Sequence, residues 1–137
     1  MSSLVAKVSS IENCDNLHIV KFDFDGLILS MMSLDLSSSI KVGTTVRLLV
    51  KPTHIAIAKN FKGDVSYSNQ LDSTIDEIIN GQLLTSIKLK IKENITLESI
   101  ITLNSSKKMN LKVGDRVTAF IKASELSIGE VIDVWYV

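Results

Sequence analysis

Apolar and polar residues alternate along several short stretches of the chain, and this period of two is the pattern of half-buried β-strands. Three aliphatic side chains alternate with three lysines over residues 87–92, and residues 20–25 alternate in the same way. The Asp-Gly pair at residues 25–26 then predicts a tight hairpin turn. The apolar positions of residues 46–50 and 117–121 also fall on one face, which predicts a strand in each segment.

Loops rich in serine separate the expected strands at residues 37–39 and 105–109, and each loop is long enough for one helical turn. The one proline, Pro52, falls where a strand is expected to end, because proline has no N–H to donate to a sheet. Five short strands with one helical turn, repeated twice, predict an all-β fold. We expect two tandem OB-like, five-stranded β-barrel units.

The strand pattern occurs twice because the sequence itself repeats. Residues 41–46 return as residues 112–117. The Val-Lys-Pro-Thr of residues 50–53 returns as the Ile-Lys-Ala-Ser of residues 121–124. Both pairs of segments are 71 residues apart. What repeats is a small β module that ends in a lysine followed two residues later by a hydroxyl group.

The alignment continues towards the N-terminus with shorter offsets. The offset is 69 residues where Ser33 aligns with Thr102. Nearer the N-terminus, the offset falls to 67 residues. Each change falls between apolar runs, where a loop absorbs two extra residues at little cost. The repeat therefore predicts a first unit at residues 1–65 and a second unit at residues 66–137, which ends in a tail strand.

Composition and charge narrow the function classes. The chain has 15 basic and 15 acidic residues, so its formal net charge is zero, and only 5% of its residues are aromatic. A surface that binds nucleic acid needs a basic surplus, and single-strand binding also needs stacked aromatics, so we expect no nucleic-acid partner. No nucleophile–base pair or carboxylate pair stands at a readable spacing, so we expect neither an enzyme nor an organic cofactor.

The expected location is the cytoplasm, with no membrane partner. The single cysteine, Cys14, excludes an internal disulfide and suits a reducing compartment. The first residues lack the charged lead and apolar stretch of a signal peptide, and no apolar run approaches the roughly 20 residues of a membrane helix. Two units of roughly 65 residues would each be marginally stable alone, so we expect them to pack together or to form a homo-oligomer.

Four motifs of the second unit resemble those of Mop domains, the molybdate- and tungstate-binding class of TOBE-type modules. Residues 66–71, Ser-Tyr-Ser-Asn-Gln-Leu, resemble the Ser-Ala-Arg-Asn-Gln-Leu opening of these domains. Residues 101–105 resemble their central hydroxyl loop, and residues 112–115 and 121–124 resemble their closing Lys-x-Gly-Asp and Ile-Lys-Ala-Ser segments. The motifs stand in the family's order and spacing, and the first unit follows them more loosely. The whole chain is therefore similar to tandem, di-domain Mop proteins.

The resemblance implies an oxyanion site at the subunit interfaces of a homo-oligomer, a trimer or a dimer. A tetrahedral dianion such as molybdate or tungstate needs hydrogen-bond donors, and it is bound as the oxyanion, so no protein group coordinates the metal directly. The implied donors of the second unit are Ser66, Ser68, Asn69, Thr102, Ser105, Lys122 and Ser124, and the first unit keeps Ser33, Lys51 and Thr53. The family's arginine is Ser68 here, and Leu36 takes the place of Ser105 in the first unit.

Several of these residues also have ordinary structural interpretations. Lys51 and Lys122 could be solvated lysines at strand ends, which is the usual environment of lysine. Residues 102–105 could cap the helical turn that follows, and a cap is compatible with anion binding. His54 is expected to be structural or surface-exposed, because Glu125 occupies the equivalent position of the repeat and no ligand role is repeated.

Three function classes remain open. The first is cytoplasmic binding of molybdate or tungstate for storage or homeostasis. The second is a molybdate-sensing effector module that acts through a separate regulatory or transport partner. The third is a small-barrel adaptor or nucleic-acid binder that no longer binds an anion. In each case, the tail at residues 131–137, with Trp135 and Tyr136, is expected to be a subunit contact.

Overall fold

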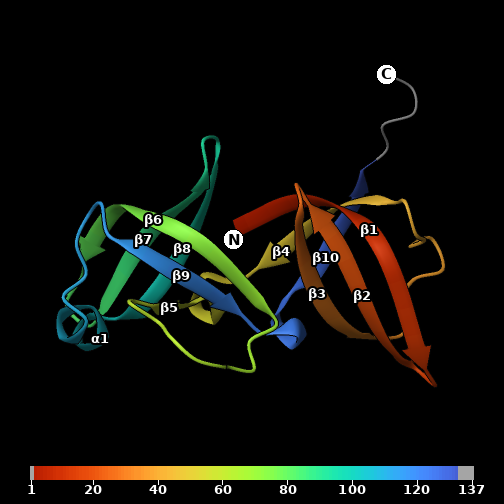
Figure 1. The fold of residues 1–137 in the computed structure, drawn as a ribbon, viewed down its shortest axis with the longest axis horizontal. Helices are drawn as coiled ribbons and strands as arrows, with labels where there is room; N and C mark the ends of the chain where they lie inside the picture. The colour runs from red at the N-terminus through yellow and green to blue at the C-terminus, as the bar shows by residue number, and fades with distance from the viewer. Residues whose placement is uncertain (1, 133–137) are drawn as a thin grey trace.

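The computed structural model describes residues 2–132. Its strands form two five-stranded antiparallel sheets, each curled like an open barrel, and the two lie side by side along the long axis of the molecule (Figure 1). The predicted all-β fold with two OB-like units is confirmed. The first sheet, in the order β10-β4-β1-β2-β3, consists of β1 (Ser2–Cys14), β2 (Leu17–Phe24), β3 (Leu27–Leu34), β4 (Thr45–Val50) and β10 (Ser127–Ile132).

The second sheet runs in the order β5-β9-β6-β7-β8. Its strands are β5 (Ala56–Ala58), β6 (Asn69–Asn80), β7 (Leu84–Lys92), β8 (Ile95–Thr102) and β9 (Arg116–Ile121). The helix α1 (Leu103–Lys108) connects β8 with β9. Two short 3-10 helices, η1 (Pro52–His54) and η2 (Ala123–Glu125), follow β4 and β9, and Pro52 therefore comes after a strand end as predicted.

Each sheet takes one strand from the other half of the sequence. β5 comes from the first half but pairs with β9, and β10 comes from the second half but pairs with β4. The helices η1 and η2 are therefore crossovers, at which the chain leaves one sheet for the other (Figure 1). The boundary predicted between residues 65 and 66 lies in the segment before β6, and both sheets contain strands from each side of it.

The repeated glycines form the same turn in both halves. Gly43 and Gly114 have φ angles of 96° and 94°, which glycine adopts without steric cost. The Gly43 N–H donates to the Val8 carbonyl, and the Gly114 N–H donates to the Ile75 carbonyl, each at 2.8 Å. The predicted Asp-Gly hairpin turn is also confirmed, because residues 25–26 both have positive φ angles between β2 and β3.

The structure corrects the alignment at the ends of β3 and β8. Leu34 pairs with Leu17, whereas Thr102 pairs with Leu84, the repeat equivalent of Leu17. Leu34, and not Ser33, is therefore the equivalent of Thr102, and the predicted alignment is wrong by one residue. The reason is that the hairpins before this point differ in length by one residue and not by two.

The helical turn expected between the strands of both halves forms an α-helix only in the second. There α1 follows β8 directly. In the first half, the serine-rich loop makes a hydrogen-bonded turn in which the Ile40 N–H donates to the Ser37 carbonyl at 3.1 Å. The first loop is shorter than the second, which leaves too few residues to complete a helix.

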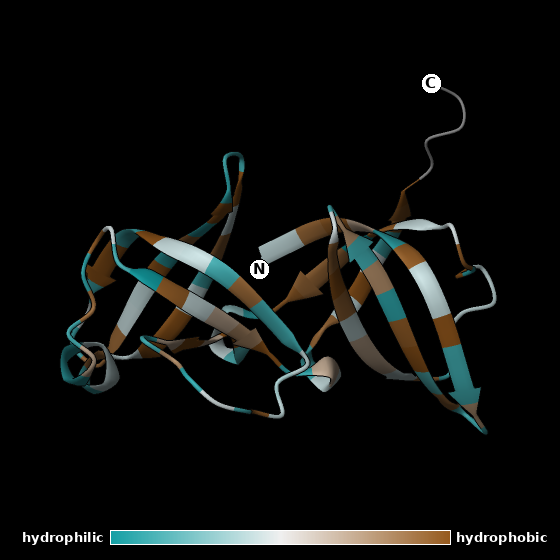
Figure 2. Ribbon diagram, in the orientation of Figure 1, coloured by the Kyte–Doolittle hydropathy of each residue, from teal (hydrophilic) through white to brown (hydrophobic). Residues whose placement is uncertain are grey.

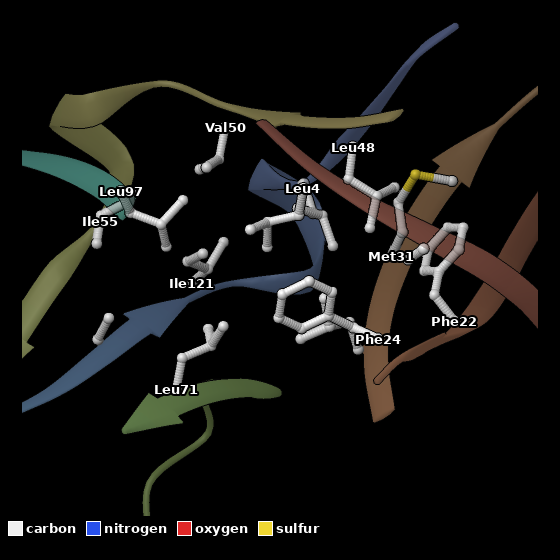
Figure 3. Close-up of a cluster of buried hydrophobic side chains, with 14 of the residues drawn as sticks. Leu4, Phe22, Phe24, Met31, Leu48, Val50, Ile55, Leu71, Leu97 and Ile121 are labelled. Carbon is white, nitrogen blue, oxygen red and sulfur yellow. The ribbon is translucent and has the colours of Figure 1, made fainter. Parts of the chain in front are cut away.

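One continuous hydrophobic core joins the two sheets. Hydrophobic and hydrophilic bands alternate along the strands, as Figure 2 shows, and the faces predicted to be buried are buried: Val46, Leu48 and Val50, with their equivalents Val117, Ala119 and Ile121. Figure 3 shows Leu4 and Phe24 of the first sheet in the same cluster as Leu71 and Ile121 of the second. The two units therefore share their core, as expected for units that are too small to be stable alone.

The C-terminal tail is described only in part. Val131 and Ile132 end β10, whereas the predicted contact through Trp135 and Tyr136 lies outside the described residues. Within residues 2–132, no helix is long and apolar enough to span a membrane.

Candidate functional site

The two crossovers meet each other. η1 packs against β8 of the second sheet, and η2 packs against β3 of the first. The Ser99 hydroxyl on β8 donates a 2.6 Å hydrogen bond to the carbonyl of Ile55, directly after η1. Between the crossovers, His54 Nδ1 lies 2.7 Å from Glu125 Oε2. His54 and Glu125 occupy equivalent positions of the repeat, so two residues that align in sequence also touch in space.

A first cleft of about 300 Å³ lies beside this His–Glu contact. Lys122, from the end of β9, and Thr53, from η1, line it together. The cleft therefore combines a lysine of the second half with a hydroxyl of the first half. Tyr67 and the isoleucines of residues 100–101 form much of the remaining wall. We name it the Lys122 cleft.

A second cleft of about 220 Å³ lies on the same His–Glu contact, which lines both clefts. Here Lys51 comes from the first half and Ser124 from the second. Lys51 is the repeat equivalent of Lys122, and Ser124 is the equivalent of Thr53. In this Lys51 cleft the lysine thus comes from the first half and the hydroxyl from the second, which is the reverse of the Lys122 cleft. Each cleft combines residues of both halves because the strands are exchanged.

The two lysines are not engaged by carboxylates. Among the ion pairs formed by residues 2–132, none includes Lys51 or Lys122. Both side chains are exposed, so each ammonium can bind an anion without breaking an existing ion pair. Within the described part of the chain, no group of three or more His, Cys, Asp or Glu residues could hold a metal ion directly. In each cleft the lysine and the hydroxyl group beside it are donors that could bind an anion.

Asn69 makes its side-chain hydrogen bonds inside the protein. It is fully buried, its amide donates to the Ser30 carbonyl at 2.9 Å, and its Oδ1 accepts from the Ser30 N–H at 2.7 Å. A buried amide needs such partners, and the two bonds join the start of β6 to β3 of the other sheet. The neighbouring Ser66 and Ser68 are exposed in the segment between β5 and β6.

Thr102 and Ser105 form the N-terminal cap of α1. Thr102 Oγ1 accepts a 3.1 Å hydrogen bond from the Ser105 N–H and lies 2.9 Å from Ser105 Oγ, to which it donates. This is the capping role that the sequence also allowed. Neither residue lines either cleft. Ser33 lines a separate groove of about 590 Å³ formed by β3 and β10, together with Ser124.

Several residues that line the clefts are absent from the predicted set, among them Tyr67, His54 and Glu125. Tyr67 stands inside the opening motif, and the 71-residue spacing of His54 and Glu125 is the sequence signal for their contact. Four predicted residues surround the crossovers, namely Lys51, Thr53, Lys122 and Ser124. The structure places the other six outside the two clefts: Ser33, Ser66, Ser68, Asn69, Thr102 and Ser105.

Comparisons with known proteins agree with this architecture. Residues 66–128 match the model of the TOBE domain family. The crystal structure of the cytoplasmic molybdate-binding protein ModG, with molybdate bound, superposes with a TM-score of 0.85 at 21% identity, covering 93% of this chain and 94% of that one. A molybdate-binding protein from Sporomusa ovata is 34% identical over 52% of this chain and 100% of its own, with a TM-score of 0.45. No curated protein matches the chain. The chain thus contains a TOBE domain at residues 66–128, and it has the fold of ModG over nearly its whole length.

Proposed function

We propose that this protein binds molybdate or tungstate as an intact oxyanion, with the Lys122 cleft and the Lys51 cleft as its sites. The observation that carries the proposal is the pairing, in each cleft, of a hydroxyl group with a lysine that forms no ion pair among residues 2–132. The ammonium offsets part of the dianion's charge, and the hydroxyl supplies an oriented neutral donor. No bond is broken in this process, so the protein acts as a binder without catalysis or an organic cofactor.

The fold supports this choice of anion. ModG, whose crystal structure contains molybdate, has the same fold over nearly the whole chain. Tungstate is included because it is also a tetrahedral dianion and has nearly the same size. Since ModG is a cytoplasmic protein, we also propose that this protein acts in the cytoplasm. Its proposed role there is the storage or homeostasis of the anion.

A homo-oligomer would give the remaining predicted donors a role. Ser66, Ser68 and Thr102 are exposed, so they are accessible to an anion held by a second copy of the chain. The groove of β3 and β10 supports such an assembly, because Leu34 is 69% exposed and Val131 is 45% exposed beside it. Covering these apolar side chains in a dimer or a trimer would remove them from water.

Isothermal titration with molybdate and tungstate tests the proposal, with sulfate and phosphate as competing tetrahedral anions. Lys122→Ala and Lys51→Ala should each weaken binding in one cleft roughly 10- to 100-fold, the effect of losing one hydrogen bond to a charged group. Lys21→Ala is the matched control, because Lys21 is an exposed lysine of β2 that lines neither cleft. Wild-type affinity in both cleft variants, or an equal loss in the control, would refute the assignment of the clefts.

A further inference from the structure

Tyr67 is held in a fixed position at the Lys122 cleft. Its ring stacks on the ring of Phe120, with centroids 5.1 Å apart and planes at 14°, and Phe61 packs edge-on against the same Phe120 ring at 5.2 Å. The backbone of Tyr67 is also held in place, because Gln70 Nε2 donates a 3.1 Å hydrogen bond to the Tyr67 carbonyl. The buried side chain of Asn69 anchors the same segment to β3.

The Tyr67 side chain lines the Lys122 cleft with Lys122 and Thr53, and it is half-buried there. A tyrosine offers an apolar ring for the wall and a hydroxyl that donates one hydrogen bond. None of the side-chain hydrogen bonds found among residues 2–132 uses this hydroxyl, although the main chain of Tyr67 is engaged. Because the ring has only two side-chain torsions and is already stacked, little conformational entropy is lost when the hydroxyl binds a ligand.

We propose that the Tyr67 hydroxyl is a third donor to the oxyanion in the Lys122 cleft. This inference rests on the proposed function and adds a residue to one of its two sites. A neutral donor adds a hydrogen bond without adding charge, so it favours an anion whose oxygens reach the ammonium, the threonine and the phenol together. The Lys51 cleft has no tyrosine in its lining, and its further hydroxyl, that of Ser127, already donates to the Leu49 carbonyl at 3.4 Å. The Lys122 cleft therefore binds the anion more tightly than the Lys51 cleft.

Tyr67→Phe tests the inference, because it removes the hydroxyl and keeps the stacked ring. Titrations with sodium molybdate are compared in the Lys51→Ala background, in which the Lys51 cleft is weakened and the Lys122 cleft is intact. The expected result is binding about tenfold weaker than in Lys51→Ala alone, the effect of one hydrogen bond to a charged group, with an unchanged melting temperature of the unliganded protein. Thr96→Val, which removes an exposed hydroxyl on β8 that lines neither cleft, is the matched control and should bind as its parent does.

A spectroscopic measurement separates ligand contact from a structural role. The chain has two tyrosines, so a molybdate-induced change in tyrosine near-UV absorbance should be present in the parent and lost in Tyr67→Phe. Unchanged affinity in Tyr67→Phe, while Lys122→Ala loses binding, would overturn the role of Tyr67 and leave the proposed function intact. A lowered melting temperature, together with an equal loss of binding when Tyr67→Phe is placed in the Lys122→Ala background, would overturn it in favour of a structural role. Absence of molybdate binding by the wild type would overturn both proposals.

Discussion

His54 and Glu125 line both clefts, so at the residue scale a single contact affects two binding sites. Glu125 brings a carboxylate close to where an anion is expected, which opposes binding by charge repulsion. The His54 ring, 2.7 Å away, gives that carboxylate a partner. The pair is about one-third exposed on each side, so water also screens the carboxylate.

Glu125→Gln should therefore strengthen molybdate binding in both clefts. The amide keeps the size of the side chain and removes its charge, and we expect a gain of about two- to fivefold, the effect of a partly exposed charge interaction. His54→Ala, which leaves the carboxylate without its partner, should weaken molybdate binding. The measurement is titration calorimetry at pH 7 and low ionic strength. Weaker binding by Glu125→Gln would show that the carboxylate positions a donor and does not repel the anion.

At the scale of elements, the exchanged strands are matched to their sheets by charge. Glu130 on β10 pairs with Arg47 on β4 at 2.8 Å, and Lys59, directly after β5, pairs with Asp115 before β9 at 3.0 Å. Lys59 and Glu130 occupy equivalent positions of the repeat but carry opposite charges. In the sheet that it joins, each of these two side chains therefore meets a residue of opposite charge.

The stabilising effect of Lys59 should depend on pH in a defined direction. The hydrogen bond from Lys59, with help from the Lys112 N–H, holds the pKa of Asp115 below its ordinary value. A carboxyl whose pKa is lower in the folded state stabilises the fold above its unfolded pKa, and this stability is lost as the pH falls through the folded pKa. Lys59→Met should thus unfold at lower urea concentration than the wild type at pH 7. The difference should shrink below about pH 4. An equal difference at pH 7 and pH 3 would assign the effect to packing of the lysine stem.

The elements were largely predictable, while the sheet that each one joins was not. Alternation over residues 20–25 and 87–92 predicted strands whose apolar faces are buried. Alternation identifies the face of a strand but not its neighbour, so the exchange of β5 and β10 was not predicted. The strand β5 has only three residues, and all three are half-buried, so it has no alternating pattern to read.

The site was predictable where chemistry repeats at a fixed spacing. Lys51, Thr53, Lys122 and Ser124 share one offset and lie around the crossovers. Asn69 and Thr102 were harder to interpret, because an amide or a hydroxyl binds a backbone group as readily as an anion. Only the structure shows that Ser30 and Ser105 are their partners.

At the scale of the whole molecule, the two units share one hydrophobic core and two crossovers, so we expect them to unfold together. Thermal unfolding should show one cooperative transition, and a ligand that binds only the folded state should shift that transition upwards. Molybdate at about 100 times its dissociation constant adds about 2.7 kcal/mol, which corresponds to a rise of several degrees. Differential scanning calorimetry with molybdate and with sulfate measures this shift. Two separate transitions, with only one of them shifted, would contradict the coupling.

The covalent link between the two halves affects the contacts at the centre of the molecule, where the strands are exchanged. Two identical half-length chains that traded their last strands would form a twofold-symmetric dimer, in which any residue on the axis faces its own copy. An acid would then face an acid, and a base would face a base. In the joined chain the two copies are free to diverge, so a histidine stands opposite a glutamate at equivalent positions. Joining the halves therefore permits an attractive contact on the axis that no symmetric pair of identical chains could make.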